Sequence, residues 1–194
     1  MSVVGVDIDE VLAEYAAGFF KFHNEKYGTN IDVSRLASYR FGQAIGTTEE
    51  EIVQKMAEFH STREFKELAL VPGAKESIMQ LENELIAITV RSPLIQQQTQ
   101  EWLDTHFKGK IKNIHFARNI HVGEKNRKTK ADFCREAGVQ VMIEDSLETA
   151  NDCARNEIPT ILLDKPWNQG PLPPLITRVY SWSEIPAAIK TILK

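Results

Sequence analysis

The sequence predicts an α/β fold: a Rossmann-like parallel sheet with helices on both faces, plus a small helical cap inserted after the first strand. Residues 3–8 form a short apolar run that ends in acidic residues, which is typical of a buried parallel strand. From residue 74 onward, helix-like and strand-like patterns alternate strictly. Between about residues 14 and 70, two or more helical patterns follow one another without a strand, which indicates an insert.

The insert is expected to hold two recognisable helices. The first covers residues 14–27, where apolar and aromatic residues recur at helical spacing before Gly28, a plausible stop. After a polar, irregular stretch, Thr48 and Glu51 form a capping-box signature for a second helix. A turn at Pro72-Gly73 closes the helical region.

The remaining elements follow in alternation. In order, we expect a helix over 74–82, a strand over 85–90, a helix over 94–107, a strand over 114–117, a helix over 130–137, a strand over 139–143, a helix over 147–156, a strand over 160–163 and a helix over 184–193. The sequence therefore predicts a discontinuous core of residues 1–13 and 71–194 and a cap of residues 14–70.

Composition excludes several classes of function. The chain has 194 residues with 27 acidic and 23 basic side chains, so its net charge of −4 does not favour a nucleic acid polymer or an anionic membrane. Cys134 and Cys153 form no CxxC pair, and we expect both to be buried, reduced thiols. Because the chain starts directly with a strand and its longest apolar runs are only strand-length, we expect a cytoplasmic protein.

Polar residues follow each of the first four predicted core strands. They are Asp7 and Asp9 after the first strand, Thr89, Arg91 and Ser92 after the second, Arg118 and Asn119 after the third, and Glu144, Asp145 and Ser146 after the fourth. The carboxyl ends of parallel strands meet at one edge of the sheet, where ligands bind. Carboxylates that meet there repel one another unless a cation lies between them, and oxygen-only ligands favour Mg²⁺.

These residues resemble a known family. The run Val4-Gly5-Val6-Asp7-Ile8-Asp9 resembles the hydrophobic strand and DxD signature of the haloacid dehalogenase-type phosphatases. Thr89 after the second strand, Lys130 at the start of a helix and the acidic pair Glu144-Asp145 follow in the family's order. The resemblance covers essentially the whole chain.

The resemblance implies a role for each residue. Asp7 would attack the phosphorus and carry the phosphoryl group, and Asp9 would protonate the leaving oxygen and later activate water. Asp7, the Asp9 main-chain carbonyl and Asp145 would hold Mg²⁺, which screens the anionic nucleophile from the phosphate. Thr89 would donate a hydrogen bond to a phosphoryl oxygen, and Lys130 would neutralise another and orient Asp7.

Some assignments stay open at this point. Lys128 is an alternative to Lys130, because both belong to a basic cluster. Glu144 can assist through a water molecule rather than by direct ligation. Glu10 stands where many family members have glycine, and Glu144 where aspartate is frequent, so both add acid near the metal.

Within the superfamily, the chain is similar to the cytosolic 5′(3′)-deoxyribonucleotidase branch. The likeness rests on the insert and on short motifs: Val71-Pro72-Gly73-Ala74, Thr89-Val-Arg91-Ser-Pro93, Lys130-Ala-Asp-Phe-Cys134, Ile143-Glu-Asp-Ser146, Asp164-Lys-Pro-Trp167-Asn168 and Arg178-Val-Tyr-Ser-Trp182. It implies a nucleoside 5′-monophosphate substrate. Tyr39, Arg40 and Phe41 would contact the base, and Arg91 and Ser92 would also bind substrate.

Several aromatic residues are expected to have structural roles instead. We expect Phe19 and Phe20 to pack in the core of the cap. Trp167 and Trp182 are expected to pack in the core or in a lid rather than to contact substrate.

Three alternatives remain from the sequence alone. A phosphatase of the same mechanism could act on a sugar phosphate or another small metabolite. A phosphoacceptor module also gathers aspartate, threonine and lysine at a sheet edge, although its acceptor aspartate comes later in the chain. A scaffold that binds nucleotides without hydrolysis is disfavoured, because all four catalytic elements are present. The chain also has neither GxGxxG nor GxxxxGK[ST]. The sequence leaves open whether the protein is a monomer or a homodimer.

Overall fold

The computed structural model describes residues 2–118 and 128–194, and in these residues six parallel strands form one sheet. The strands are β1 (Val3–Val6), β2 (Glu84–Thr89), β3 (Ile111–Phe116), β4 (Val139–Glu144), β5 (Thr160–Leu163) and β6 (Ile176–Val179). Their spatial order is β3-β2-β1-β4-β5-β6. The predicted fold class is confirmed, and β6 is an edge strand that the sequence patterns did not indicate.

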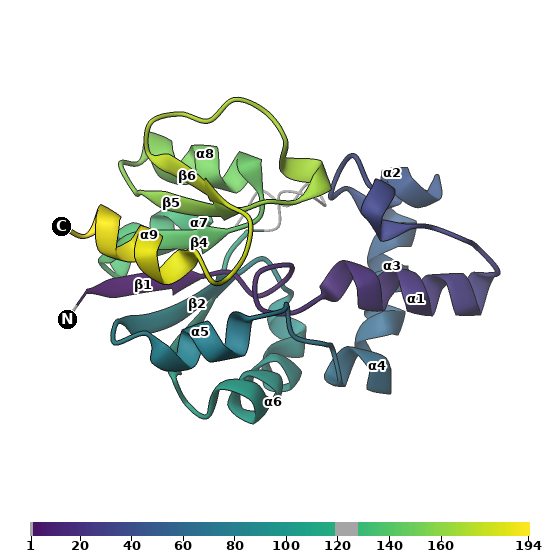
Figure 1. The fold of residues 1–194 in the computed structure, drawn as a ribbon. Helices are drawn as coiled ribbons and strands as arrows, with labels where there is room; N and C mark the ends of the chain where they lie inside the picture. Colours follow the sequence, from purple (N-terminus) through teal and green to yellow (C-terminus); the bar gives the residue numbers. More distant parts are fainter. Residues whose placement is uncertain (1, 119–127) are drawn as a thin grey trace.

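Helices cover both faces of the sheet. The helices are α1 (Tyr15–Tyr27), α2 (Phe41–Ile45), α3 (Glu49–His60), α4 (Arg63–Lys66), α5 (Ala74–Gln80), α6 (Gln96–Phe107), α7 (Lys130–Glu136), α8 (Leu147–Arg155) and α9 (Ile185–Ile192). In Figure 1, α5, α6 and α9 lie on one face of the sheet and α7 and α8 on the other. Across the described part of the chain, every helix is too short or too polar to cross a lipid bilayer.

The second strand shows why both faces are covered. Alternate residues of β2 point to opposite sides: Leu85 and Ala87 join the larger hydrophobic core, whereas Ile86 and Ile88 join the core that includes Cys134. A strand whose successive residues are all apolar cannot leave either face in water, so each face needs its own helices. As predicted, the thiols of Cys134 and Cys153 are buried and free.

The helices of the insert pack around aromatic side chains that belong to the larger hydrophobic core. Phe19 of α1 stacks on Phe41 of α2, with ring centroids 5.4 Å apart, and meets Phe59 of α3 edge-on at 5.7 Å. α1 ends at Gly28, whose φ of 67° is left-handed and therefore suits glycine. The predicted capping box between Thr48 and Glu51 begins α3. Figure 1 shows α1 to α4 at the end of the sheet opposite the two chain termini.

The chain enters and leaves these helices through two adjacent segments. The Val71 N–H donates to the Leu12 carbonyl at 2.8 Å, and the Glu14 N–H donates to the Ala69 carbonyl at 2.9 Å. The insert is thus joined to the sheet by a short paired stem. We predicted a core of residues 1–13 and 71–194 and a cap of residues 14–70, and this division stays a prediction. Its two boundaries would lie in this stem.

Candidate active site

The polar residues that follow the central strands gather at one edge of the sheet. β1 lies between β2 and β4, so the loop that carries Asp7 and Asp9 is flanked by Thr89 and Arg91 on one side and by Asp145 on the other. All five side chains belong to buried residues. After β3, Arg118 is partly buried, and Asn119 lies outside the described residues.

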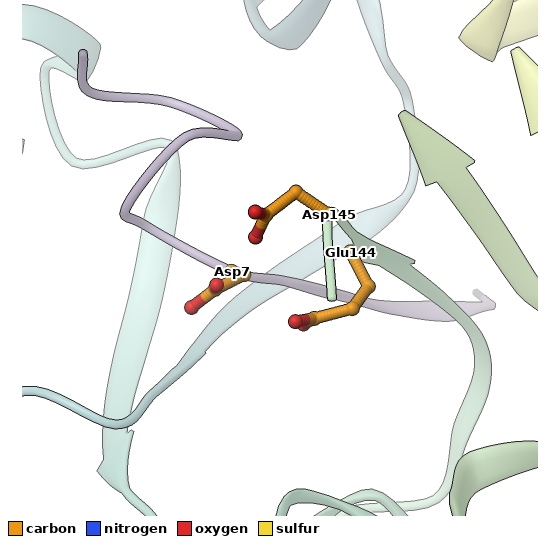
Figure 2. A group of neighbouring side chains, drawn as sticks. All are labelled: Asp7, Glu144 and Asp145. Atoms are coloured by element: carbon orange, nitrogen blue, oxygen red, sulfur yellow. The ribbon is translucent and has the colours of Figure 1, made fainter. Parts of the chain in front are cut away.

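Three carboxylates form the centre of this edge. Asp7, Glu144 and Asp145 each place one oxygen within 4.8 Å of the others (Figure 2). Burial raises the pKa of Asp7, and the nearby Asp9 raises it further, against the opposing effect of Lys130. Burial, followed by the charges of Asp7 and Glu10, raises the pKa of Asp145 to about 8. Burial and neighbouring carboxylates thus disfavour the ionised forms of Asp7 and Asp145, and the oxygen-only donor set fits a hard divalent ion that would offset this.

Lys130 compensates part of this negative charge. Its Nζ lies 2.8 Å from Asp7 Oδ1 and 2.8 Å from Glu144 Oε2. Burial lowers the pKa of Lys130, but the two carboxylates raise it by more, so the net shift is upward and the ammonium stays charged. The alternative, Lys128, pairs with Glu136 in a half-exposed ion pair. The structure therefore brings Lys130, and not Lys128, to the carboxylates.

The lysine reaches the site because of how α7 begins. Lys130 is the first residue of α7, and Thr129 and Asp132 form a capping box there. The cap fixes the helix start next to the end of β4, since the side chains of Thr129 and Asp132 satisfy main-chain N–H groups that would otherwise lack partners. This local geometry places the Lys130 side chain, which belongs to a basic cluster in the sequence, in the buried site.

Asp9 is held by Arg91. Its carboxylate accepts from Arg91 Nε at 3.0 and 3.1 Å and from Nη2 at 2.6 Å, and Arg91 Nη1 donates to Thr99 Oγ1 at 3.3 Å. Arg91 was expected to bind substrate. In the structure its guanidinium group donates hydrogen bonds to Asp9, the candidate acid/base residue. Arg91 would therefore contact a substrate while it remains paired with Asp9.

Thr89 lies at the end of β2 and is fully buried. Its Oγ1 accepts the Arg91 main-chain N–H at 3.2 Å. A hydroxyl group that accepts one hydrogen bond can still donate one, which is what the predicted contact with a phosphoryl oxygen requires.

A cavity of about 420 Å³ lies between this edge and the cap helices. All five residues predicted to bind substrate line it: Tyr39, Arg40, Phe41, Arg91 and Ser92. Apolar side chains of α3 and of the segment after β2 form much of its wall, namely Ile52, Val53, Met56, Ala57, Leu94 and Ile95. The three central carboxylates do not line this cavity, whereas Asp9 does, so Asp9 lies where the cavity meets the charged edge.

The predicted base-contacting residues differ in their surroundings. Phe41 is 1% exposed and packs against Phe19 and Phe20, so it also belongs to the larger hydrophobic core. The Tyr39 ring lies 5.2 Å from the Trp167 ring, centroid to centroid, and so joins the cap to the core. Phe19 and Phe20 are buried in the cap, as predicted.

Two residues of the loop after β5 contact the site, although the sequence predicted only a packing role for this region. Trp167 Nε1 donates to Asp145 Oδ2 at 2.8 Å, and Asn168 Nδ2 donates to the Asp145 carbonyl at 2.7 Å. The sequence signal was the motif Asp164-Lys-Pro-Trp167-Asn168, which its position beyond a strand end could have linked to the ligand-binding edge. Trp182, in contrast, packs in the core as expected, 1% exposed.

Glu10 is a third residue whose contacts were missed. Its φ of 63° is left-handed, a conformation that glycine adopts without strain and that other residues rarely take. One carboxylate oxygen accepts the Ala16 N–H at 2.5 Å, and the other lies 3.5 Å from Lys165 Nζ. Burial raises the pKa of Glu10 to about 7, against the lowering effect of Lys165.

Comparison with known proteins agrees with this arrangement. The model of a family described as "5′ nucleotidase, deoxy (Pyrimidine), cytosolic type C protein" matches residues 1–193. A protein of Halalkalibacterium halodurans, provisionally named a nucleotidase, is 26% identical over 193 residues, covering 98% of this chain and 93% of its own. YqfW of Bacillus subtilis, also provisionally named a nucleotidase, is 28% identical over 184 residues, covering 93% of this chain and 90% of its own.

The fold has relatives of known structure. A haloacid dehalogenase-like hydrolase of Streptococcus pneumoniae superposes with a TM-score of 0.69 and 14% identity, over 97% of this chain and 98% of that one. At this identity the likeness concerns the fold alone. The family match over residues 1–193, together with the haloacid dehalogenase-like fold, places this chain in the cytosolic type C 5′-nucleotidase family, a family of phosphoric monoester hydrolases of the haloacid dehalogenase type.

Proposed function

We propose that this protein is a Mg²⁺-dependent 5′-nucleotidase that hydrolyses nucleoside or deoxynucleoside monophosphates through an aspartyl-phosphate on Asp7. One observation carries the proposal: the buried Asp7 carboxylate lies 2.8 Å from Lys130 Nζ and within 4.8 Å of two further carboxylates. Asp9 lines a neighbouring cavity of about 420 Å³, a volume in the size range of small-ligand sites. The family's description as a cytosolic nucleotidase supports both the substrate class and a cytoplasmic location.

The side chains of Asp7 and Asp145 and the main-chain carbonyl of Asp9 would hold Mg²⁺. When bound, the ion supplies positive charge between the carboxylate nucleophile and the phosphate dianion. The donor set fits because it consists of oxygen atoms only and because its carboxylates repel one another when no cation is present.

The chain's own residues divide the reaction into two steps. In the first, an Asp7 oxygen forms a bond to phosphorus, the bond from phosphorus to the leaving oxygen breaks, and Asp9 gives its proton to that oxygen. In the second, Asp9 takes a proton from water, which attacks the phosphorus and releases phosphate and the Asp7 carboxylate. Throughout, Lys130 would orient Asp7, and the Thr89 hydroxyl would donate to a phosphoryl oxygen.

The experiment is phosphate release from ribo- and deoxyribonucleoside 5′-monophosphates and from sugar phosphates, with and without Mg²⁺. Asp7→Asn serves as the blank, and Asp104→Asn, at an exposed position on α6, serves as the matched control. We expect metal-dependent turnover of nucleotides by the wild type and by Asp104→Asn, and none by Asp7→Asn. Turnover of sugar phosphates alone would retain the mechanism and reject the nucleotidase assignment. Stable phosphorylation without turnover would indicate a phosphoacceptor.

A further inference from the structure

The three tryptophan residues of this chain donate their indole N–H groups to different kinds of acceptor. Trp102 donates to the main-chain carbonyl of Leu68 at 3.0 Å, and Trp182 donates to that of Val11 at 2.7 Å. Both of these indoles are buried in the hydrophobic core. Trp167 is only partly buried, and its N–H donates to a carboxylate oxygen, Asp145 Oδ2. Its hydrogen bond therefore contacts one of the three clustered carboxylates, Asp7, Glu144 and Asp145.

The loop that carries Trp167 is fixed to the main chain beside Asp145. Trp167 lies in a short 3₁₀ turn, Pro166–Asn168, in the loop that follows β5. Asn168 is fully buried, and its Nδ2 donates both to the Asp145 carbonyl at 2.7 Å and to the Leu163 carbonyl at 2.8 Å. Arg178 of β6 donates to Asn168 Oδ1 at 2.6 Å. The indole N–H is thus held at a set position relative to the backbone of Asp145.

The ring of Trp167 is held from two further sides. Tyr39, which precedes α2 in the cap, has its ring centroid 5.2 Å from that of Trp167 at an interplanar angle of 50°. The ammonium group of Lys165 lies 5.8 Å from the Trp167 ring centroid, and it also pairs with Glu10 at 3.5 Å. An indole confined by the cap, its own loop and an ion pair can present its N–H in few orientations.

We propose that Trp167 is a positioning residue for the divalent-ion site. By donating to Oδ2, it fixes the rotation of the Asp145 carboxylate and leaves Oδ1 for the ion. No group among residues 2–118 and 128–194 donates a hydrogen bond to Oδ1. Donors behind a ligating carboxylate set its orientation, and their loss typically weakens metal binding about 10- to 100-fold. This inference rests on the metal site of the proposed function.

The test is Mg²⁺ binding to metal-free protein, measured by isothermal titration calorimetry. Trp167→Phe removes the N–H donor and keeps an aromatic ring next to Tyr39. Trp102→Phe is the matched control, because it removes an N–H bonded only to a main-chain carbonyl. We expect the Mg²⁺ dissociation constant to rise about 10- to 100-fold in Trp167→Phe and to change less than about twofold in Trp102→Phe.

A second measurement uses the unmodified protein, in case Trp167→Phe does not fold. The indole N–H resonances are followed by ¹⁵N NMR during a Mg²⁺ titration, with assignments from single Trp→Phe variants at positions 102 and 182. The resonance of Trp167 should shift with saturation, while those of Trp102 and Trp182 stay in place. A wild type that binds Mg²⁺ with an unmoved Trp167 resonance, or a folded Trp167→Phe that binds it equally well, would overturn the inference alone. A wild type that binds no Mg²⁺ would overturn the metal site itself.

Discussion

Arg91 and Asp9, 82 residues apart in the chain, form an ion pair in which two guanidinium nitrogen atoms contact one carboxylate. The shortest contact, Nη2 to Oδ1, is 2.6 Å, and the two side chains are 2% and 12% exposed. The pair joins the loops after β1 and β2 where the cavity begins. Arg91 therefore determines the direction in which the candidate acid/base carboxyl points.

Removing Arg91 should destabilise the protein. Arg91→Met leaves the Asp9 carboxylate buried without its partner, and loss of one member of a buried pair costs about 3–5 kcal/mol. The measurement is the free energy of unfolding in urea at pH 7. Arg63→Met is the control, because Arg63 pairs with Glu67 at the surface, where such a pair contributes about 0–1 kcal/mol. If both variants lose the same unfolding free energy, the buried pair stabilises the protein no more than the surface pair does.

Replacing Lys130 should reduce catalysis, whereas replacing Lys128 should not. Lys130→Met removes the cation 2.8 Å from Asp7, so we expect kcat to fall about 10²- to 10³-fold. Lys128→Met breaks only a half-exposed pair with Glu136 and should keep kcat within about twofold. Steady-state phosphate release, with circular dichroism to confirm folding, measures both. A folded, active Lys130→Met beside an inactive Lys128→Met would reverse the assignment of the lysine.

The buried Asp145 carboxyl group should make the metal-free protein less stable as pH rises. The pKa of Asp145 is raised from 3.8 to about 8, so the folded state keeps a proton that the unfolded chain releases. The stabilisation that comes from this proton on Asp145 is therefore complete below about pH 4 and is lost as pH rises through about 8. In EDTA, the difference in unfolding free energy between wild type and Asp145→Asn should decline over this window.

Adding Mg²⁺ near pH 8 should restore the stability of the wild type. A ligand at 100 times its dissociation constant adds about 2.7 kcal/mol to the free energy of unfolding. Asp145→Asn should gain much less, and Asp152→Asn, on α8 in an ion pair with Arg155, should behave as wild type. If Asp145→Asn gains as much as wild type, Asp145 is not a ligand.

Filling the cavity should affect large substrates more than small ones. Met56 lies in the cavity wall on α3, so Met56→Trp should raise KM for a nucleoside monophosphate about tenfold or more. Acetyl phosphate does not need this space, and its kcat/KM should stay within about twofold. Gln54→Trp, at an exposed α3 position that does not line the cavity, is the matched control. Equal effects on both substrates would mean that the cavity does not hold the nucleoside.

The sequence by itself determined the fold class, the family and most of the local structure. Apolar runs of strand length separated by helical patterns are enough to define a parallel α/β sheet, because each run must be buried on both faces. Local signals also located the α3 capping box at Thr48 and Glu51 and placed Lys130 at a helix start. Since parallel strands end at one edge, the polar residues after them could be predicted to converge.

The tertiary structure alone decided which side chains meet. The Arg91 contact with Asp9 depends on β2 lying next to β1, and the Trp167 contact with Asp145 depends on how the loop after β5 turns. Neither is encoded in periodicity, which records only which residues share a face of one element. β6 was missed because its four residues, Ile-Thr-Arg-Val, are too few to show a period and, unlike the equally short β5, do not form a mostly apolar run. Strand order and loop geometry arise from packing of the whole chain, and here they connect the candidate metal ligands to the cap.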